Sequence, residues 1–213
     1  MNWRKNTDYR VYLVTDRSLC LDRSLEIIAT AAAQGGVGIV QLREKNLASR
    51  DFLEEAKRLV ALLHPLGIPV VINDRVDIAL ASGAAGVHVG QSDLPAVEAR
   101  RLLGPNAIVG LSVENREQLK EAENPDIDYV GISPVFSTPT KKDTAPPWGL
   151  EGLAWARTNS PLRLVAIGGI HLHNAKDVIA AGADGLAVVS EICSAPNPAL
   201  ATAQLKALFP KSA

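Results

Sequence analysis

Short apolar runs recur along this chain at a steady spacing, and several of them end abruptly in polar residues. Residues 37–45 read Val-Gly-Ile-Val-Gln-Leu-Arg-Glu-Lys, an apolar segment that turns directly into an amide and three charges. Because the runs are continuously apolar, they are typical of strands buried on both faces of a parallel sheet. Eight strands are predicted, at residues 11–15, 37–42, 70–73, 86–89, 108–111, 129–132, 164–167 and 186–189.

Helical spacing fills the segments between these runs. It is clearest over residues 50–63, where apolar side chains recur at intervals of three and four. Glycines at positions 35, 83 and 182 stand where a helix should end before the next strand. Helices are predicted at residues 24–34, 50–63, 75–81, 96–103, 116–122, 150–158, 174–181 and 199–208.

Eight strand–helix units in so short a chain predict an α/β fold, a single (β/α)₈ TIM barrel that fills residues 1–213 as one domain. The alternative is a doubly wound open sheet, in which strands and helices alternate similarly. No Gly-x-Gly-x-x-Gly motif opens the first helix, which weakens that alternative. The irregular stretch 134–149 is too long for an ordinary connection and is a candidate active-site loop.

Composition excludes several classes of protein. The chain is 47% hydrophobic and 21% charged, with 22 basic and 23 acidic residues. It therefore lacks the excess of basic residues that is typical of nucleic-acid-binding proteins. No apolar stretch approaches the ~20 residues that span a bilayer, and no signal peptide is evident, so we expect a cytoplasmic protein without a membrane partner. Cys20 and Cys193 are too few for a disulfide framework or a four-thiolate zinc site. The sequence does not decide the oligomeric state, and a homo-oligomer is left open.

The reactive groups of a TIM barrel lie at the carboxyl ends of its strands. Guanidinium, ammonium and carboxylate groups all fall at those ends in this chain, together with amides, hydroxyls and glycines. The candidates are Gln41, Arg43, Lys45, Asn73, Asp74, Gln91, Asp93, Ser112, Thr138, Lys141, Gly168, Gly169 and Ser190.

Asp74 and Asp93 follow neighbouring strands, so a barrel can bring them together. Two close carboxylates are unfavourable unless a proton or a cation lies between them. Mg²⁺ suits such a sparse site, because it takes one or two carboxylates and fills its other positions with water and phosphate oxygens. The alternative is that each aspartate only caps a helix.

Arg43 and Lys45 alternate with Glu44, so both should point to one side of the strand together with Gln41. Such a cationic mouth favours a polyanion, although a strand end held by salt bridges to Glu44 is the alternative. The pair Gly168-Gly169 lies where these barrels commonly grip phosphate, or it is a plain turn. No Ser, His or Cys arrangement forms a covalent triad, and His88 is interpreted as a bonded core or mouth histidine. These residues together indicate a metal-assisted barrel enzyme with room for two phosphorylated groups, and they do not identify its reaction.

Five motifs along the chain resemble the thiamine phosphate synthase family. They are Gln-Leu-Arg-Glu-Lys at 41–45, Asn-Asp-Arg-Val-Asp-Ile-Ala-Leu at 73–80, Gly-Val-His-Val-Gly-Gln at 86–91, Thr-Pro-Thr-Lys at 138–141 and Ala-Ile-Gly-Gly-Ile at 166–170. The resemblance implies a magnesium-dependent transferase on a (β/α)₈ barrel. Such an enzyme joins 4-amino-2-methyl-5-hydroxymethylpyrimidine diphosphate to 4-methyl-5-(2-phosphoethyl)thiazole, and it releases pyrophosphate.

By position, the resemblance assigns two substrate sites and a metal site. The pyrimidine diphosphate would contact Gln41, Leu42, Arg43, Glu44, Lys45, Asn73, Ser112 and Lys141. The thiazole phosphate would contact Thr138, Pro139, Thr140, Gly169, Val189 and Ser190. Asp74 and Asp93 would bind magnesium, and Arg43, Lys45, Ser112 and Lys141 would act in catalysis.

Two other functions remain as alternatives. The related thiazole tautomerase branch is expected to carry a histidine soon after the serine of strand 5, whereas Val113, Glu114 and Asn115 follow Ser112 here. A barrel that only senses a phosphorylated ligand would have no use for the full set of leaving-group residues. Ser133 and Ser137 depart locally from the family pattern, which bears on loop geometry more than on chemistry.

Overall fold

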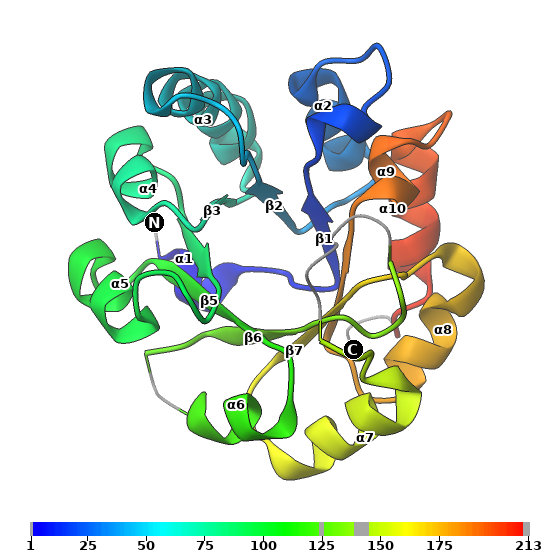
Figure 1. Ribbon diagram of the computed structural model, residues 1–213. Coiled ribbons are helices and arrows are strands. Elements are labelled where there is room, and N and C mark those ends of the chain that lie inside the picture. Colours follow the sequence, from blue (N-terminus) through cyan, green and yellow to red (C-terminus); the bar gives the residue numbers. More distant parts are fainter. Residues whose placement is uncertain (1, 124–125, 139–144, 211–213) are drawn as a thin grey trace.

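Eight parallel strands form a closed barrel, and helices surround it (Figure 1). The computed structural model describes residues 2–123, 126–138 and 145–210. Each strand pairs with the next along the chain, and β1 (Val11–Val14) closes the ring by pairing with β8 (Gly185–Val188). The predicted (β/α)₈ fold is confirmed, and the closed ring excludes an open doubly wound sheet.

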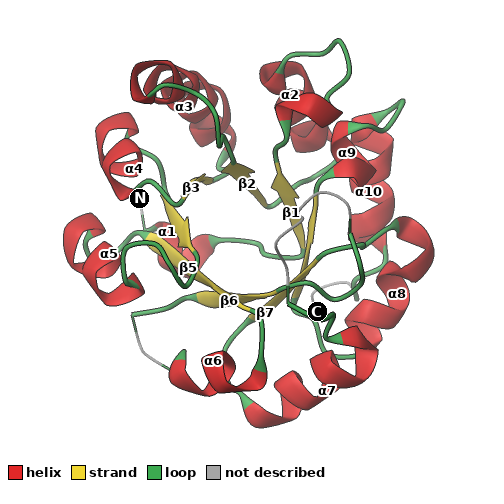
Figure 2. Cartoon of the chain, in the orientation of Figure 1, coloured by secondary structure: helices red, strands yellow, loops and turns green. Residues whose placement is uncertain are grey.

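The strands make an inner ring and the helices an outer one (Figure 2). The other strands are β2 (Ile39–Leu42), β3 (Val70–Asn73), β4 (Gly86–Val89), β5 (Ile108–Val113), β6 (Tyr129–Ile132) and β7 (Leu164–Ile167). The principal helices are α2 (Leu25–Gln34), α3 (Ser49–Leu63), α4 (Val76–Ser82), α5 (Ala96–Leu103), α6 (Arg116–Glu121), α7 (Gly149–Asn159), α8 (Leu172–Ala180) and α10 (Pro198–Ala207).

Alternate residues of each strand pack into two separate apolar cores. In β1, Val11 and Leu13 belong to the core between the barrel and its helices, whereas Tyr12 belongs to the core inside the barrel. Strand β2 repeats the pattern, with Val40 facing the helices and Ile39 facing inward. Burial on both faces explains why the strands read as unbroken apolar runs.

Four short elements were not predicted: α1 (Trp3–Asn6), η1 (Arg17–Leu19), η2 (His64–Leu66) and α9 (Ser190–Cys193). Helix α1 precedes the first strand and lies at the amino end of the barrel. Its Trp3 side chain packs on the inner core, and its Arg4 guanidinium pairs with Asp128 just before β6. Elements of three or four residues are too short to show a hydrophobic period.

The predicted ends of β3, β4, β6, β7 and α5 are confirmed, and the ends of the other predicted elements differ by at most two residues. The largest functional consequence is in β5, which continues to Val113, so that Ser112 lies within the strand and not after it. In the described part of the chain, no helix combines the length and apolar character needed to span a membrane.

Candidate active site

Two adjoining cavities open at the carboxyl end of the barrel. The larger has a volume of about 540 Å³ and lies over the ends of β2 to β5. Seven of the residues predicted for the pyrimidine diphosphate or magnesium line it: Gln41, Arg43, Lys45, Asn73, Asp74, Asp93 and Ser112. Residues far apart in the sequence are therefore brought to one place, as the strand-end argument predicted.

The smaller cavity has a volume of about 250 Å³ and lies over the ends of β7 and β8. Thr138, Gly169, Val189 and Ser190, all predicted for the thiazole phosphate, line it. The two cavities share lining residues, and Arg43 is the only cation among those that the structure describes, so one guanidinium faces both.

Side chains at the end of β2 alternate between the cavity side and the helix side of the strand. Gln41, Arg43 and Lys45 reach the larger cavity. Leu42 is fully buried in the core that faces the helices, and the Glu44 side chain lies on that side too, so neither side chain lines a cavity. The parity argument correctly placed the first three residues together, because side chains alternate along a strand.

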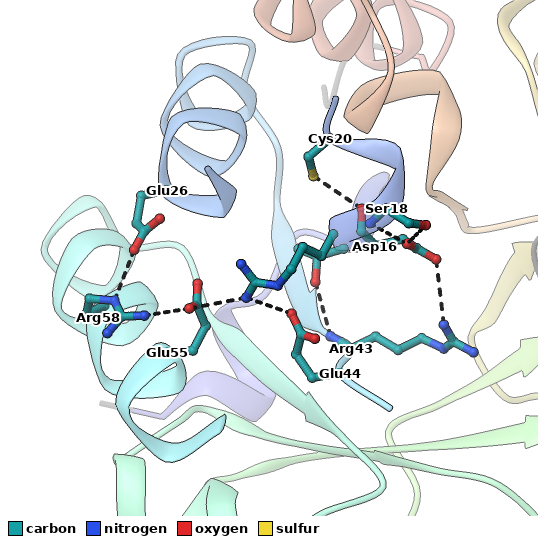
Figure 3. Close-up of polar contacts among 10 residues, drawn as sticks. Asp16, Ser18, Cys20, Glu26, Arg43, Glu44, Glu55 and Arg58 are labelled. Atoms are coloured by element: carbon teal, nitrogen blue, oxygen red, sulfur yellow. Dashed lines mark hydrogen bonds and ion pairs between the residues drawn. The ribbon is translucent and has the colours of Figure 1, made fainter. Parts of the chain in front are cut away.

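Glu44 takes part in a charged network outside the barrel (Figure 3). The Arg17 guanidinium donates to its carboxylate at 3.0 Å and also pairs with Glu55 at 3.3 Å. Arg58 links Glu55 to Glu26. Burial raises the pKa of the Glu44 carboxyl, and Arg17 opposes that rise. The predicted alternative of a salt-bridged strand end thus applies to Glu44, but its partner is Arg17 and not Arg43 or Lys45.

Arg43 is oriented by the loop after β1. Its backbone N–H donates to the Thr15 hydroxyl at 3.1 Å, and its guanidinium lies 3.9 Å from the Asp16 carboxylate (Figure 3). Asp16 is itself held by the backbone N–H and hydroxyl of Ser18. A guanidinium with only one distant carboxylate keeps donors for a phosphate ligand.

Asp74 and Asp93 come together at the larger cavity, and neither caps a helix. Helix α4 begins after Arg75 and α5 after Pro95. Asp74 pairs with Lys45 at 2.6 Å, and Asp93 accepts the Gly90 N–H at 2.7 Å. Burial raises the pKa of the Asp93 carboxyl, and the nearby Asp74 carboxylate raises it further. The capping interpretation is therefore wrong.

This pair of carboxylates fits a magnesium ion. Within the described ranges, no group of three or more His, Cys, Asp or Glu side chains is arranged for a metal, so a protein-only cage is not formed there. Magnesium does not need one, since it commonly takes two carboxylates and completes its shell with water and phosphate oxygens. A cation would also relieve the mutual repulsion that raises the Asp93 pKa.

The smaller cavity has the features of a phosphate site. Gly168 and Gly169 both have positive φ angles, of 102° and 64°, so the loop after β7 bends in a way that favours glycine. Ser190 begins the short helix α9 directly after β8. Ser133 and Ser137, which depart from the family pattern, both line this cavity and add hydroxyls to it.

Some candidate residues lie elsewhere or cannot be located. Pro139, Thr140 and Lys141 lie outside the described residues. His64 is half-buried against Trp3, with ring centroids 4.8 Å apart, and lies away from both cavities. His88 is a bonded mouth histidine as predicted, since its ring contacts Ser112 and Tyr129.

Sequence reasoning missed several residues of the site, notably Tyr12, Tyr129 and Asp16. Tyr12 and Tyr129 line the larger cavity and are otherwise buried in the barrel. A polar aromatic residue inside an apolar strand was the available signal. Its meaning depends on which residue faces it across the barrel, which the local pattern does not reveal.

A closed (β/α)₈ barrel with two joined cavities at its carboxyl mouth has the architecture of a barrel enzyme. Comparison with known proteins makes this specific. Residues 11–192 match the family model described as thiamine monophosphate synthase. The thiamine-phosphate synthase of Albidiferax ferrireducens is 56% identical over 200 residues, which cover 94% of this chain and 91% of that protein. The thiamine-phosphate synthase of Leptospira biflexa is 56% identical over 203 residues, with 93% and 97% covered.

Solved structures agree. Thiamine phosphate pyrophosphorylase from Pyrococcus furiosus superposes with a TM-score of 0.86 at 35% identity, covering 95% of this chain and 96% of that one. A 3-hexulose-6-phosphate synthase at 20% identity has a TM-score of 0.70 and shares the fold alone. The chain belongs to the thiamine monophosphate synthase family and is a transferase of that family.

Proposed function

We propose that this enzyme condenses 4-amino-2-methyl-5-hydroxymethylpyrimidine diphosphate with 4-methyl-5-(2-phosphoethyl)thiazole, giving thiamine phosphate and pyrophosphate. The observation that carries the proposal is the pair of adjoining cavities, of about 540 and 250 Å³, that share Arg43. A reaction between two phosphorylated substrates needs two anion sites side by side, one for the departing diphosphate and one for a phosphate that does not react.

The larger cavity would hold the pyrimidine diphosphate. Arg43 and Lys45 face it from the end of β2, and Asn73 and Ser112 face it from the ends of β3 and β5. Lys141 joins this set by resemblance. Cations aimed at the leaving group stabilise the charge that grows there as the C–O bond breaks. Leu42 and Glu44 would contribute through their backbone, since their side chains point away from the cavity.

Asp74 and Asp93 would hold the magnesium ion. When bound, it would supply positive charge to the diphosphate oxygens and so favour their departure. The carboxylates themselves are suited to this role because they lie at the rim of the larger cavity, within reach of Lys45.

The smaller cavity would hold the thiazole phosphate through Thr138, Gly169, Val189 and Ser190, with Pro139 and Thr140 added by resemblance. Backbone N–H groups in a glycine loop approach a phosphate closely. The thiazole nitrogen already has a lone pair, so it attacks the pyrimidine methylene carbon without a general base. The bond to diphosphate breaks first, and the electron pair leaves with the diphosphate. This order explains why the site contains no covalent triad among the described residues.

One assay tests the proposal against its alternatives. Purified protein is mixed with the pyrimidine diphosphate, the thiazole phosphate and Mg²⁺, and pyrophosphate is measured with and without chelator. The proposal predicts release that requires both substrates and stops with chelator. Isomerisation of a thiazole alone would indicate the tautomerase, and binding without turnover would indicate a sensor; either result would overturn the proposal.

A further inference from the structure

A continuous chain of hydrogen bonds crosses the larger cavity between two of its predicted substrate residues. Gln41 Nε2 donates to the Tyr12 hydroxyl at 2.8 Å, and the Tyr12 and Tyr129 hydroxyl oxygens are 2.7 Å apart. The Tyr129 hydroxyl lies 2.8 Å from His88 Nδ1. His88 Nε2 in turn lies 2.8 Å from Ser112 Oγ. All five residues line the cavity, and they come from five different strands.

Both tyrosine phenols are protonated at neutral pH. Tyr12 and Tyr129 are each only 1% exposed. Burial raises the pKa of both phenols, because the charged phenolate is poorly solvated there. Each hydroxyl therefore has one proton to donate and can also accept.

The direction of these hydrogen bonds follows from keeping every buried hydroxyl proton bonded. In the reverse order Tyr12 would accept from both Gln41 and Tyr129, and its own proton would have no acceptor among these five residues. The Gln41 amide nitrogen can only donate, so the Tyr12 oxygen accepts from it. The Tyr12 proton is then available to the Tyr129 oxygen, and the Tyr129 proton to His88 Nδ1. With Nδ1 accepting, the imidazole carries its proton on Nε2, and that proton goes to Ser112 Oγ.

We propose that Tyr12, Tyr129 and His88 are positioning residues that set the hydrogen-bonding polarity of the pyrimidine site. Ser112 accepts from His88, so its own hydroxyl proton is directed to a substrate acceptor. Gln41 commits its amide nitrogen to Tyr12, so its amide oxygen is presented to a substrate donor such as a ring amino group. The assignment of Gln41 and Ser112 to the substrate rests on the proposed function, whereas the direction of the chain does not.

The backbone makes room for this chain at two glycines. A Cβ atom at Gly110 would lie 2.1 Å from the Tyr129 ring, far too close for any side chain. A Cβ atom at Gly131 would lie 3.2 Å from the His88 ring. The Tyr129 ring is also stacked on His88, with centroids 5.4 Å apart. Local packing therefore holds both rings where their polar atoms meet.

The His88 tautomer tests the direction without any substrate. Nitrogen-15 NMR distinguishes protonated from unprotonated imidazole nitrogens, and the chain has only four histidines, so the His88 signals can be assigned by comparison with a His88→Gln variant. We expect a proton on Nε2 in the wild-type protein. A proton on Nδ1 would overturn the proposal.

Three conservative variants distinguish an effect of the hydrogen bonds from an effect of side-chain packing. Tyr129→Phe removes the donor to Nδ1, and we expect it to give a mixture of His88 tautomers. Tyr12→Phe should leave the tautomer unchanged, because the Tyr129 proton still has Nδ1 as acceptor. Tyr9→Phe is the matched control: the Tyr9 ring lies 5.2 Å from that of Tyr129, but its hydroxyl takes no part in the hydrogen bonds that join Gln41 to Ser112. An unchanged tautomer in Tyr129→Phe would contradict the proposal.

Kinetics give the second readout. Loss of a buried hydrogen bond that orients substrate groups should lower kcat/KM for the pyrimidine diphosphate about tenfold in Tyr12→Phe and Tyr129→Phe. The KM for the thiazole phosphate, and all constants of Tyr9→Phe, should stay near wild type. Equal losses in all three variants would indicate packing alone. If the wild-type enzyme is active but His88 carries its proton on Nδ1, the proposed hydrogen-bond direction is wrong and the proposed function stands. If His88 carries its proton on Nε2 but the enzyme is inactive, only the proposed function is wrong.

Discussion

Lys45 and Asp74 form an ion pair 2.6 Å long at the mouth of the larger cavity. The ammonium group that we assign to the diphosphate is thus held by a carboxylate that we assign to the metal. Asp74 has a φ of 64°, a left-handed conformation that Asp and Asn adopt more readily than most residues. Its carboxylate is turned toward Lys45 and Asp93 by a backbone that few other residues would tolerate.

This geometry predicts the effect of Asp74→Asn. Asparagine tolerates the left-handed backbone but lacks the charge, so the fold should persist while magnesium binding weakens. We expect the Mg²⁺ concentration for half-maximal pyrophosphate release to rise at least about tenfold. Asp77→Asn is the control, since Asp77 is exposed and pairs with Arg75 outside both cavities. An unchanged magnesium dependence in Asp74→Asn would contradict the metal assignment.

Gly169→Ala should damage the smaller cavity selectively. A Cβ atom there would lie 2.8 Å from Phe136 Cβ and 2.9 Å from the Ser137 carbonyl oxygen, in addition to the strain of φ 64°. Gly83→Ala is a matched control with φ 70° and no atom within 4 Å of the added carbon. We expect Gly83→Ala to lose about 1 kcal/mol of stability from the backbone strain alone, and Gly169→Ala to lose more because its added carbon also clashes. Only Gly169→Ala should raise the KM for the thiazole phosphate, by about tenfold or more. Equal KM values in the two variants would rule out a phosphate role for this loop.

Glu191 joins the loops after β7 and β8. Its carboxylate accepts from the Leu172 N–H at 3.2 Å and lies 2.8 Å from His171 Nδ1, next to Ser190. Glu191→Ala removes both contacts. We expect the KM for the thiazole phosphate to rise several-fold, which corresponds to the free energy of about one hydrogen bond. Glu191→Gln keeps an acceptor for Leu172 and should lose less. Steady-state rates with the pyrimidine diphosphate saturating provide the comparison, and a raised KM for the pyrimidine substrate instead would count against this role.

His64 gives a pH dependence of stability that is separate from catalysis. Burial lowers the pKa of His64 below its ordinary value of 6.5. The unfolded chain therefore binds the proton more readily, so stability is lost as the pH falls below 6.5 and is regained above it. His64→Phe should retain the packing on Trp3 and show a smaller loss of unfolding free energy between about pH 7 and pH 5. Urea titrations at both pH values measure this, and identical losses in variant and wild type would contradict it.

The fold was largely predictable because burial on both faces leaves unbroken apolar runs. All eight strands were predicted, and the errors at their ends come from residues such as Val37 and Val189, which are apolar but lie outside the ladder. The short helices α1 and α9 were missed because four residues carry no readable period.

The site was predictable only where local geometry decides it. Strand parity brought Gln41, Arg43 and Lys45 to one side, since it requires no knowledge of distant residues. The contacts of Glu44 with Arg17 and of Tyr12 with Tyr129 join positions 27 and 117 residues apart. Such contacts depend on how the barrel closes, so neither local period nor composition could reveal them.

We infer that the two cavities serve one condensation reaction. Quantifying both products in a single reaction tests it most directly, with thiamine phosphate measured by mass spectrometry and pyrophosphate by a coupled assay. We predict one thiamine phosphate for each pyrophosphate released, and neither product when the thiazole phosphate is left out. Pyrophosphate release without thiamine phosphate, or no reaction with both substrates and Mg²⁺ present, would contradict the account.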